Sequence, residues 1–121
     1  MINSVTIQGR LTKDATRRQL GEHGSVTNFS IANNQYAGTD RNGDPIYDTT
    51  YVNCSIFNFS EKMMKYLTTG RMVIVRGRLD VNNKEDRTYV NVVGNSINND
   101  LDIIFTPNDS DEDRKGNRNY R

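Results

Sequence analysis

The stretch of residues 50–70, TYVNCSIFNFSEKMMKYLTTG, changes its hydrophobic period part-way along. From Thr50 to Phe57 apolar and polar residues alternate, which predicts a half-buried β-strand. The core-facing positions of this strand are then Val52, Cys54 and Ile56. Beyond Phe57 the period lengthens towards that of a helix. A strand that runs straight into a short helix restricts the folds open to a small chain.

A short helix is predicted after this strand. Ser60 can serve as its N-cap, and Glu61 suits the positive end of the helix dipole. Phe59 can pack against the apolar stripe of the helix, which consists of Met63, Met64 and Leu67. Gly70 is the expected C′ residue that ends the helix.

Two strands are predicted upstream, joined by a polar stretch and a turn at residues 21–24. The apolar positions of the first strand are Val5, Ile7, Gly9 and Leu11. Gly9 inside this strand indicates a bulge or a sharp bend. The second strand turns Phe29 and Ile31 inward and leads into a predicted loop over residues 37–48.

Two more strands are predicted downstream, separated by a turn over residues 82–86. Their apolar positions are Val73, Val75, Leu79 and Val81 on the first, and Val90 and Val92 on the second. The fold class is therefore all-β, with five strands and one short helix between the third and the fourth. This order matches the five-stranded Greek-key barrel called the OB-fold. An SH3-like barrel is the nearest alternative, but it has no helix at this position.

The chain changes composition near Phe105. We expect residues 1–105 to form the barrel domain, whereas residues 106–121, TPNDSDEDRKGNRNYR, lack an apolar pattern and predict a disordered charged tail. No apolar run approaches the roughly 18 residues of a membrane span. The single cysteine fits a reducing cytoplasm. The net charge of +1 argues weakly against a nucleic-acid binder.

The outward face of the strand at residues 50–57 carries Tyr51, Asn53, Ser55 and Phe57. Two aromatic residues that bracket small polar ones suit the stacking of nucleic-acid bases. Cover by the loop at residues 37–48, or by a second subunit, also explains rings that face outward. The residues alone leave both interpretations open.

Basic residues offer candidate phosphate partners. Arg76 and Arg78 flank Gly77 on one face of a strand, where the missing side chain allows close approach of the backbone. Arg10 and Lys13, with the arginines at 17 and 18, make the first third of the chain locally basic. Solvated surface cations are the plain alternative.

Metal and nucleophile chemistries fit the sequence poorly. Residues 40–44, DRNGD, resemble the start of a calcium loop, but Pro45 and Tyr51 stand where glycine and a bidentate glutamate are needed. His23 and Cys54 are too few for a zinc site, and Cys54 is expected in the core. Neither a G-x-S-x-G motif nor a glycine-rich phosphate loop is present. We therefore predict no metal, no cofactor and no catalytic residue.

Six segments, in this order and spacing, resemble the bacterial and phage single-stranded DNA-binding proteins. The segments are MINSV leading into GRLTKD (residues 1–14), VTNFSIA (26–32), YVNCSIF (51–57), YLTTG (66–70), VRGRL (75–79) and RTYV (87–90). The resemblance covers residues 1–105. It implies an OB-fold that assembles as a homotetramer and coats single-stranded DNA without sequence preference. That role belongs to replication, recombination and repair in the cytoplasm of a bacterium or a phage-infected host.

The resemblance also implies roles for individual residues. The stacking aromatics of the family fall on Tyr36, Tyr51 and Phe57, and a fourth stacking position falls on Lys84, which suits a phosphate contact instead. Asn53 and Ser55 are expected to hydrogen-bond to the strand between stacked bases. The candidate phosphate partners are Arg10, Lys13, Arg76, Arg78 and Lys84.

Members of this family commonly end in an acidic tip with Pro-Phe that recruits replication and repair proteins. This chain ends in RNYR, which suggests either a truncated chain or a short phage- or plasmid-type member with other partners. Two further hypotheses stay open. One is an OB-fold module for RNA or for replication and primosome proteins. The other is a small nuclease that gathers Asp14, Asp44 and Asp48 around a metal.

Overall fold

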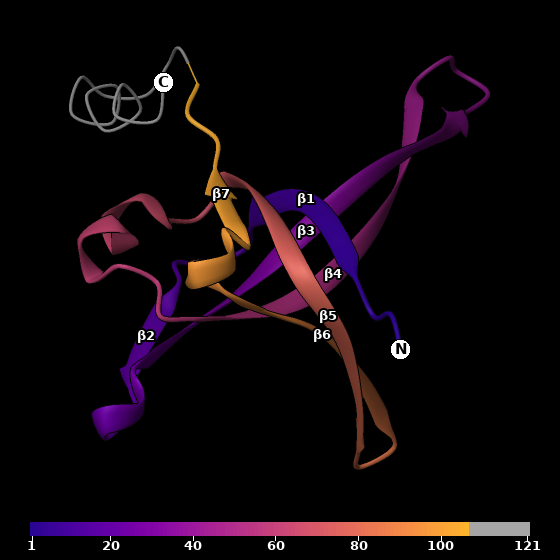
Figure 1. Cartoon of the computed structure of the whole chain (residues 1–121). Helices are drawn as coiled ribbons and strands as arrows, with labels where there is room; N and C mark the ends of the chain where they lie inside the picture. Colours follow the sequence, from indigo (N-terminus) through magenta and orange to yellow (C-terminus); the bar gives the residue numbers. More distant parts are fainter. Residues whose placement is uncertain (107–121) are drawn as a thin grey trace.

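The computed structural model describes residues 1–106, which form seven strands and three 3₁₀ helices (Figure 1). The strands are β1 (Val5–Leu11), β2 (Thr16–Gln19), β3 (Ser25–Thr39), β4 (Pro45–Phe57), β5 (Met72–Lys84), β6 (Arg87–Asn95) and β7 (Leu101–Ile103). The 3₁₀ helices span Gly21–His23, Glu61–Tyr66 and Ser96–Asn98. The five long strands are the predicted ones, whereas β2 and β7 are additional.

The five long strands close on themselves in the order β1-β3-β4-β6-β5, because β5 pairs in turn with β1. The β4–β6 pairing is parallel and the others are antiparallel. This is the partly open barrel of the predicted OB-fold, in which β1 also pairs with β3, at Arg10 and Leu11. Gly9 lies where β1 passes from β5 to β3, and an added Cβ would lie 2.7 Å from the carbonyl oxygen of Ala32. The glycine thus permits a close backbone approach rather than a bulge.

The barrel interior holds the residues that the period-two pattern selects. The buried apolar cluster consists of Leu11, Phe29, Ile31, Val52, Cys54, Ile56, Phe59, Leu67, Val73, Val75 and Val92. The prediction that Val52, Cys54 and Ile56 face the core is confirmed. Their neighbours on β4 therefore point away from the core.

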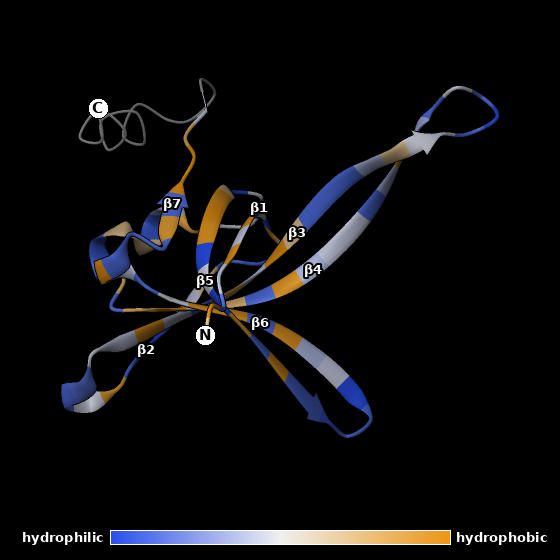
Figure 2. Ribbon diagram, turned by 45° about the vertical axis from the view of Figure 1, so that its right-hand side comes forward, coloured by the Kyte–Doolittle hydropathy of each residue, from blue (hydrophilic) through white to orange (hydrophobic). Residues whose placement is uncertain are grey.

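The prediction of a loop over residues 37–48 is wrong for most of this segment. β3 and β4 stay paired out to Thr39↔Pro45, with one register shift between Tyr36 and Gly38. They form a long hairpin arm that projects from the barrel, and its outer part is mostly hydrophilic (Figure 2). Both faces of the arm meet solvent, so hydrophobic alternation gives no strand signal there. Asp40 closes the remaining turn by accepting the N–H groups of Asn42 and Asp44.

The predicted helix is present but is a single 3₁₀ segment, Glu61–Tyr66, that ends before Gly70. Ser60 makes no side-chain capping bond, and the N–H of Leu67 donates to Met64 in the i→i+3 manner. Phe59 and Leu67 nevertheless lie in the core, as expected for the apolar side of this segment.

Two short strands were not expected from the sequence. The polar stretch Thr16–Gln19 is β2, which pairs with β3 and carries no apolar alternation. The second of them is β7, Leu101–Ile103, which pairs with β5 after the 3₁₀ helix Ser96–Asn98. No helix within residues 1–106 is both long enough and apolar enough to cross a bilayer.

The thiol of Cys54 should be unreactive in the folded protein. Burial raises the pKa of its thiol to about 12, so the thiolate fraction at neutral pH falls roughly a thousandfold below that of an ordinary cysteine. We expect iodoacetamide to label Cys54 at a measurable rate only when the chain is unfolded in urea. Mass spectrometry checks this, and equally fast labelling of the native protein would contradict the burial of the thiol.

Candidate nucleic-acid interface

The outward face of β3 and β4 forms one continuous polar and aromatic surface. Their pairing aligns Asn28 with Ser55, Ser30 with Asn53, and Ala32 with Tyr51. Aligned residues of a sheet point to the same side, so these six side chains share the face opposite the core. Ser55 donates a hydrogen bond of 2.7 Å to the side-chain oxygen of Asn28, which fixes this amide.

This face is hollowed into a groove of about 320 Å³. Its floor consists of Asn28, Ser30, Asn53 and Ser55. The turn between β1 and β2, which carries Lys13, lines one side, and Asn91 of β6 lines the other. The groove is therefore open, and hydrogen-bonding side chains form its floor, which suits an extended polar chain.

Aromatic side chains lie on the same outward face. Tyr51 is 67% exposed, whereas Phe57 is half-buried. Tyr36 is an even number of residues from Ala32 on β3, so its side chain points to the same side of the strand. It is 63% exposed on the arm. Tyr47, which the sequence reasoning missed, aligns with Tyr36, and the two rings meet edge to face at 6.2 Å between centroids. Its alternation with Thr49 and Tyr51 was the available signal.

The β5–β6 hairpin contributes a second set of residues to this side of the molecule. Its strands stay paired to Lys84↔Arg87, so the predicted turn at 82–86 is only Glu85-Asp86, both with positive φ. The face that continues from Asn91 carries Arg78, Asp80, Asn82 and Lys84 from β5, and Arg87, Tyr89 and Val93 from β6. Basic residues and an exposed tyrosine thus share one hairpin face.

Tyr51 and Tyr89 occupy matching positions on two diverging hairpins. β4 and β6 pair in parallel from Asn53↔Asn91 onward, and each tyrosine lies two residues before its strand's asparagine. The two hairpins point away from each other beyond this level (Figure 1). Tyr89, a residue missed at the sequence level, therefore offers an aromatic ring near the place where the family resemblance puts Lys84.

The candidate phosphate partners differ in their surroundings. Lys13 lines the groove. Arg78 pairs with Val93 of β6, and Val93 pairs in turn with Ser55 on the floor of the groove. Arg10 aligns with Ala32 and donates to the carbonyl of Gly70. Arg76 instead forms a 2.7 Å ion pair with Asp102, so an incoming phosphate would share its guanidinium with that carboxylate.

Asp14 anchors the turn that carries Lys13. Its carboxylate accepts the backbone N–H of Thr69 at 2.8 Å and the hydroxyl at 3.0 Å, and these bonds lower its pKa below the usual 3.8. A lowered pKa stabilises the folded state at pH values above the ordinary one, and this contribution disappears as the pH falls through the lowered pKa.

We therefore expect Asp14→Ala to melt at a lower temperature than the wild type at pH 7. The two melting temperatures should converge as the pH falls well below 3.8. Thermal melts followed by circular dichroism measure this, with Asp48→Ala as the control for loss of an exposed carboxylate. A melting-temperature difference that stays constant down to acidic pH would contradict the anchoring role of the charge.

No cluster of three or more metal-ligating side chains occurs within residues 1–106. Asp44 and Asp48 lie on the hairpin arm, while Asp14 is bonded to Thr69 at the barrel. The three carboxylates of the nuclease hypothesis are thus not brought together.

Comparison with known protein families identifies a family that matches most of this chain. The Single-strand binding protein family matches residues 2–101. The chain belongs to this family. The family resemblance inferred from the six segments is therefore confirmed.

Relatives within the single-strand binding protein family are moderately similar in sequence. The single-stranded DNA-binding protein of Enterococcus faecalis is 37% identical over 98 residues, which are 77% of this chain and 50% of that protein. The protein of the same name from Borreliella burgdorferi is 36% identical over 87 residues, 71% of this chain and 57% of that protein. The chain thus spans about half the length of these two relatives.

A solved structure supports the fold. The structure titled "Plasmodium falciparum SSB complex with ssDNA" superposes with a TM-score of 0.64 at 23% identity, and covers 88% of this chain and 96% of its own. At this identity the likeness concerns the fold, and the OB-fold prediction is confirmed.

Proposed function

We propose that this protein binds single-stranded DNA without sequence preference, across the outward face of β3, β4 and the β5–β6 hairpin. The observation that carries the proposal is Tyr51, which is 67% exposed beside a groove floored by Asn53 and Ser55. A large exposed ring next to hydrogen-bonding amides and hydroxyls suits base stacking, which is worth about 1–3 kcal/mol per base.

Each group on this face has a distinct task in the proposal. Tyr36, Tyr51 and Phe57 stack on bases, and the geometry adds Tyr47 and Tyr89 to this set. Asn53 and Ser55 hydrogen-bond to the strand between stacked bases. The proposed phosphate partners are Arg10, Lys13, Arg76, Arg78 and Lys84. Binding of this kind requires no metal, cofactor or catalytic residue, so we propose a binding protein rather than an enzyme.

A homo-oligomer, in keeping with the tetramer expected from the family, is part of this proposal. The second face of the β5–β6 hairpin carries exposed Leu79, Val81 and Val90. Within the described chain, the edge of β1 that faces away from β5 pairs with another strand only at Arg10 and Leu11. An apolar face beside an open strand edge suits a second copy of this chain.

In the cell, such a protein would coat exposed strands in the cytoplasm during replication, recombination and repair. Contacts with replication and repair proteins are part of the same proposal. The disordered tail predicted for residues 106–121, and the ending that differs from the family's acidic tip, lie outside the described residues except for Thr106.

Salt titration of the binding equilibrium tests the proposed mode. Affinity for oligo-dT should fall as salt rises, with a log–log slope of about −0.7 per neutralised phosphate. Competition with oligo-U is the control, because a dedicated RNA reader would use the 2′-OH and favour oligo-U. Binding that is independent of salt, or tighter to oligo-U, would contradict the proposal.

A further inference from the structure

One row of aligned residues leads from the stacking strand over the barrel to β1. Tyr51 of β4 aligns with Ala32 of β3, and Ala32 aligns with Arg10 of β1. The three side chains therefore share one face, with the smallest of them in the middle. The short methyl group of Ala32 leaves the way open between the tyrosine ring and the guanidinium.

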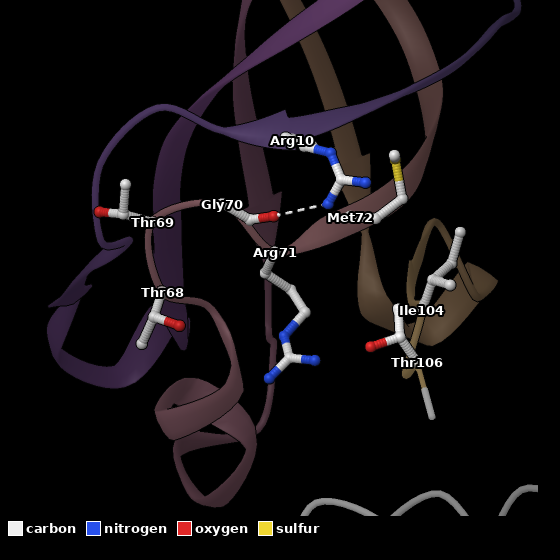
Figure 3. A pocket seen from close by; sticks show the side chains of 8 residues that line it. All are labelled: Arg10, Thr68, Thr69, Gly70, Arg71, Met72, Ile104 and Thr106. Atoms are coloured by element: carbon white, nitrogen blue, oxygen red, sulfur yellow. Dashed lines mark hydrogen bonds between the residues drawn. The ribbon is translucent and has the colours of Figure 1, made fainter. Parts of the chain in front are cut away.

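Two adjoining hollows lie along this row. One, of about 300 Å³, is lined by Gln8, Ala32 and Asn34, among others. The second, of about 290 Å³, lies over the loop from Thr68 to Arg71 (Figure 3). Both hollows are lined by Arg10 and Met72. We call the two together the trench.

The charge of the trench has one sign. Its described lining includes two arginines, Arg10 and Arg71, and no acidic residue. Arg10 is oriented by its 3.0 Å bond to the carbonyl of Gly70, and Arg71 by a 3.0 Å bond from Nε to the carbonyl of Tyr66 and by the ring of Phe105. Oriented guanidinium groups match the geometry of phosphate oxygens better than mobile ammonium groups do.

We propose that the trench is an exit path for the bound strand, which leaves the stacking face at Tyr51, crosses Ala32 and seats a backbone phosphate beside Arg10 and Arg71. This inference rests on the proposed single-stranded DNA binding. Thr68 and Thr69 also line the hollow that such a phosphate would enter (Figure 3). Strands too short to pass Tyr51 would not reach the trench.

Thr68→Glu tests the path, because Thr68 is exposed and its replacement puts a negative charge into the trench. Thr68→Gln is the matched control, because glutamine has nearly the same shape as glutamate but carries no charge. Each variant is titrated with labelled oligo-dT of about 6 and about 16 nucleotides, which bracket much of the site range of one OB-fold. Thermal melts of both variants check that the barrel stays folded.

The expected result is a loss of roughly tenfold in affinity of Thr68→Glu for the long oligonucleotide, with little change for the short one. The salt slope for the long strand should become shallower by about 0.7, since one phosphate contact is lost. Equal affinities of Thr68→Glu and Thr68→Gln for the long strand would overturn the exit path. An equal loss at both lengths would overturn it too. Failure of the wild type to bind either strand would instead overturn the proposed function.

Discussion

Tyr51→Ala is expected to weaken the binding of oligo-dT by about 1–3 kcal/mol while leaving the barrel folded. Tyr51 is exposed and its side chain lies outside the core, so its removal opens no cavity. The loss corresponds to about tenfold in Kd for each 1.4 kcal/mol. Fluorescence anisotropy of labelled oligo-dT measures it, and circular dichroism checks the fold.

Two variants control this experiment. Tyr51→Phe keeps the ring and should retain most of the affinity, since stacking uses the ring face rather than the hydroxyl. Ile97→Ala removes an exposed apolar side chain on the 3₁₀ helix Ser96–Asn98 and should have no effect. If Tyr51→Ala bound oligo-dT as tightly as Ile97→Ala, the stacking role of Tyr51 would be wrong.

Gly77→Ala is expected to destabilise the folded barrel by about 3 kcal/mol or more. Gly77 lies where β5 leaves β1 and begins to pair with β6. A Cβ at this position would collide with the backbone carbonyl of Val93, and a backbone atom cannot rotate away as a side chain can. For a domain of about 100 residues, the melting temperature should fall by roughly 10–20 °C.

Gly43→Ala separates this steric effect from backbone strain. Gly43 has φ +84° in the turn of the hairpin arm, and an added Cβ there meets no atom within 4 Å. The cost should be about 1–2 kcal/mol, from the left-handed backbone alone. Thermal or urea unfolding of both variants measures the difference. A Gly77→Ala barrel as stable as Gly43→Ala would show that β5 and β6 can separate at this point.

Sequence reasoning succeeds where one face of a strand is buried. The alternation of Val52, Cys54 and Ile56 predicts both the strand and its inward side, and hence the outward position of Tyr51. The closed five-strand order follows from such segments and the short helix between them. The sequence also placed the cysteine correctly in the core.

Sequence reasoning fails where a strand has no buried face, because apolar and polar residues then do not alternate. The arm beyond Asn34 and the outer β5–β6 hairpin meet solvent on both sides, so backbone pairing and a few exposed cross-strand side-chain contacts hold them rather than a buried core. Tyr47 and Tyr89 were missed because they fall in segments predicted as a loop or next to a predicted turn. β2 was missed because its four residues are polar and pair with the first four residues of β3.

Ion pairing in the folded structure also distinguishes basic residues that look alike in the sequence. Arg76 and Arg78 are equivalent in the sequence, flanking one glycine, yet only Arg76 forms an ion pair with Asp102. The partner comes from β7, a strand that the sequence pattern did not predict. Exposed ion pairs of this kind contribute at most about 1 kcal/mol, so the pairing leaves room for competition by phosphate.

The most direct test of single-stranded DNA binding uses the protein's own tyrosines. The chain contains six tyrosines and no tryptophan, and four of the tyrosines lie on the proposed face or its hairpins. Titration with oligo-dT should quench tyrosine fluorescence in a saturable manner, whereas a duplex of the same length should quench it far less at the same salt concentration. Absence of saturable quenching by oligo-dT, or equal quenching by the duplex, would contradict the account.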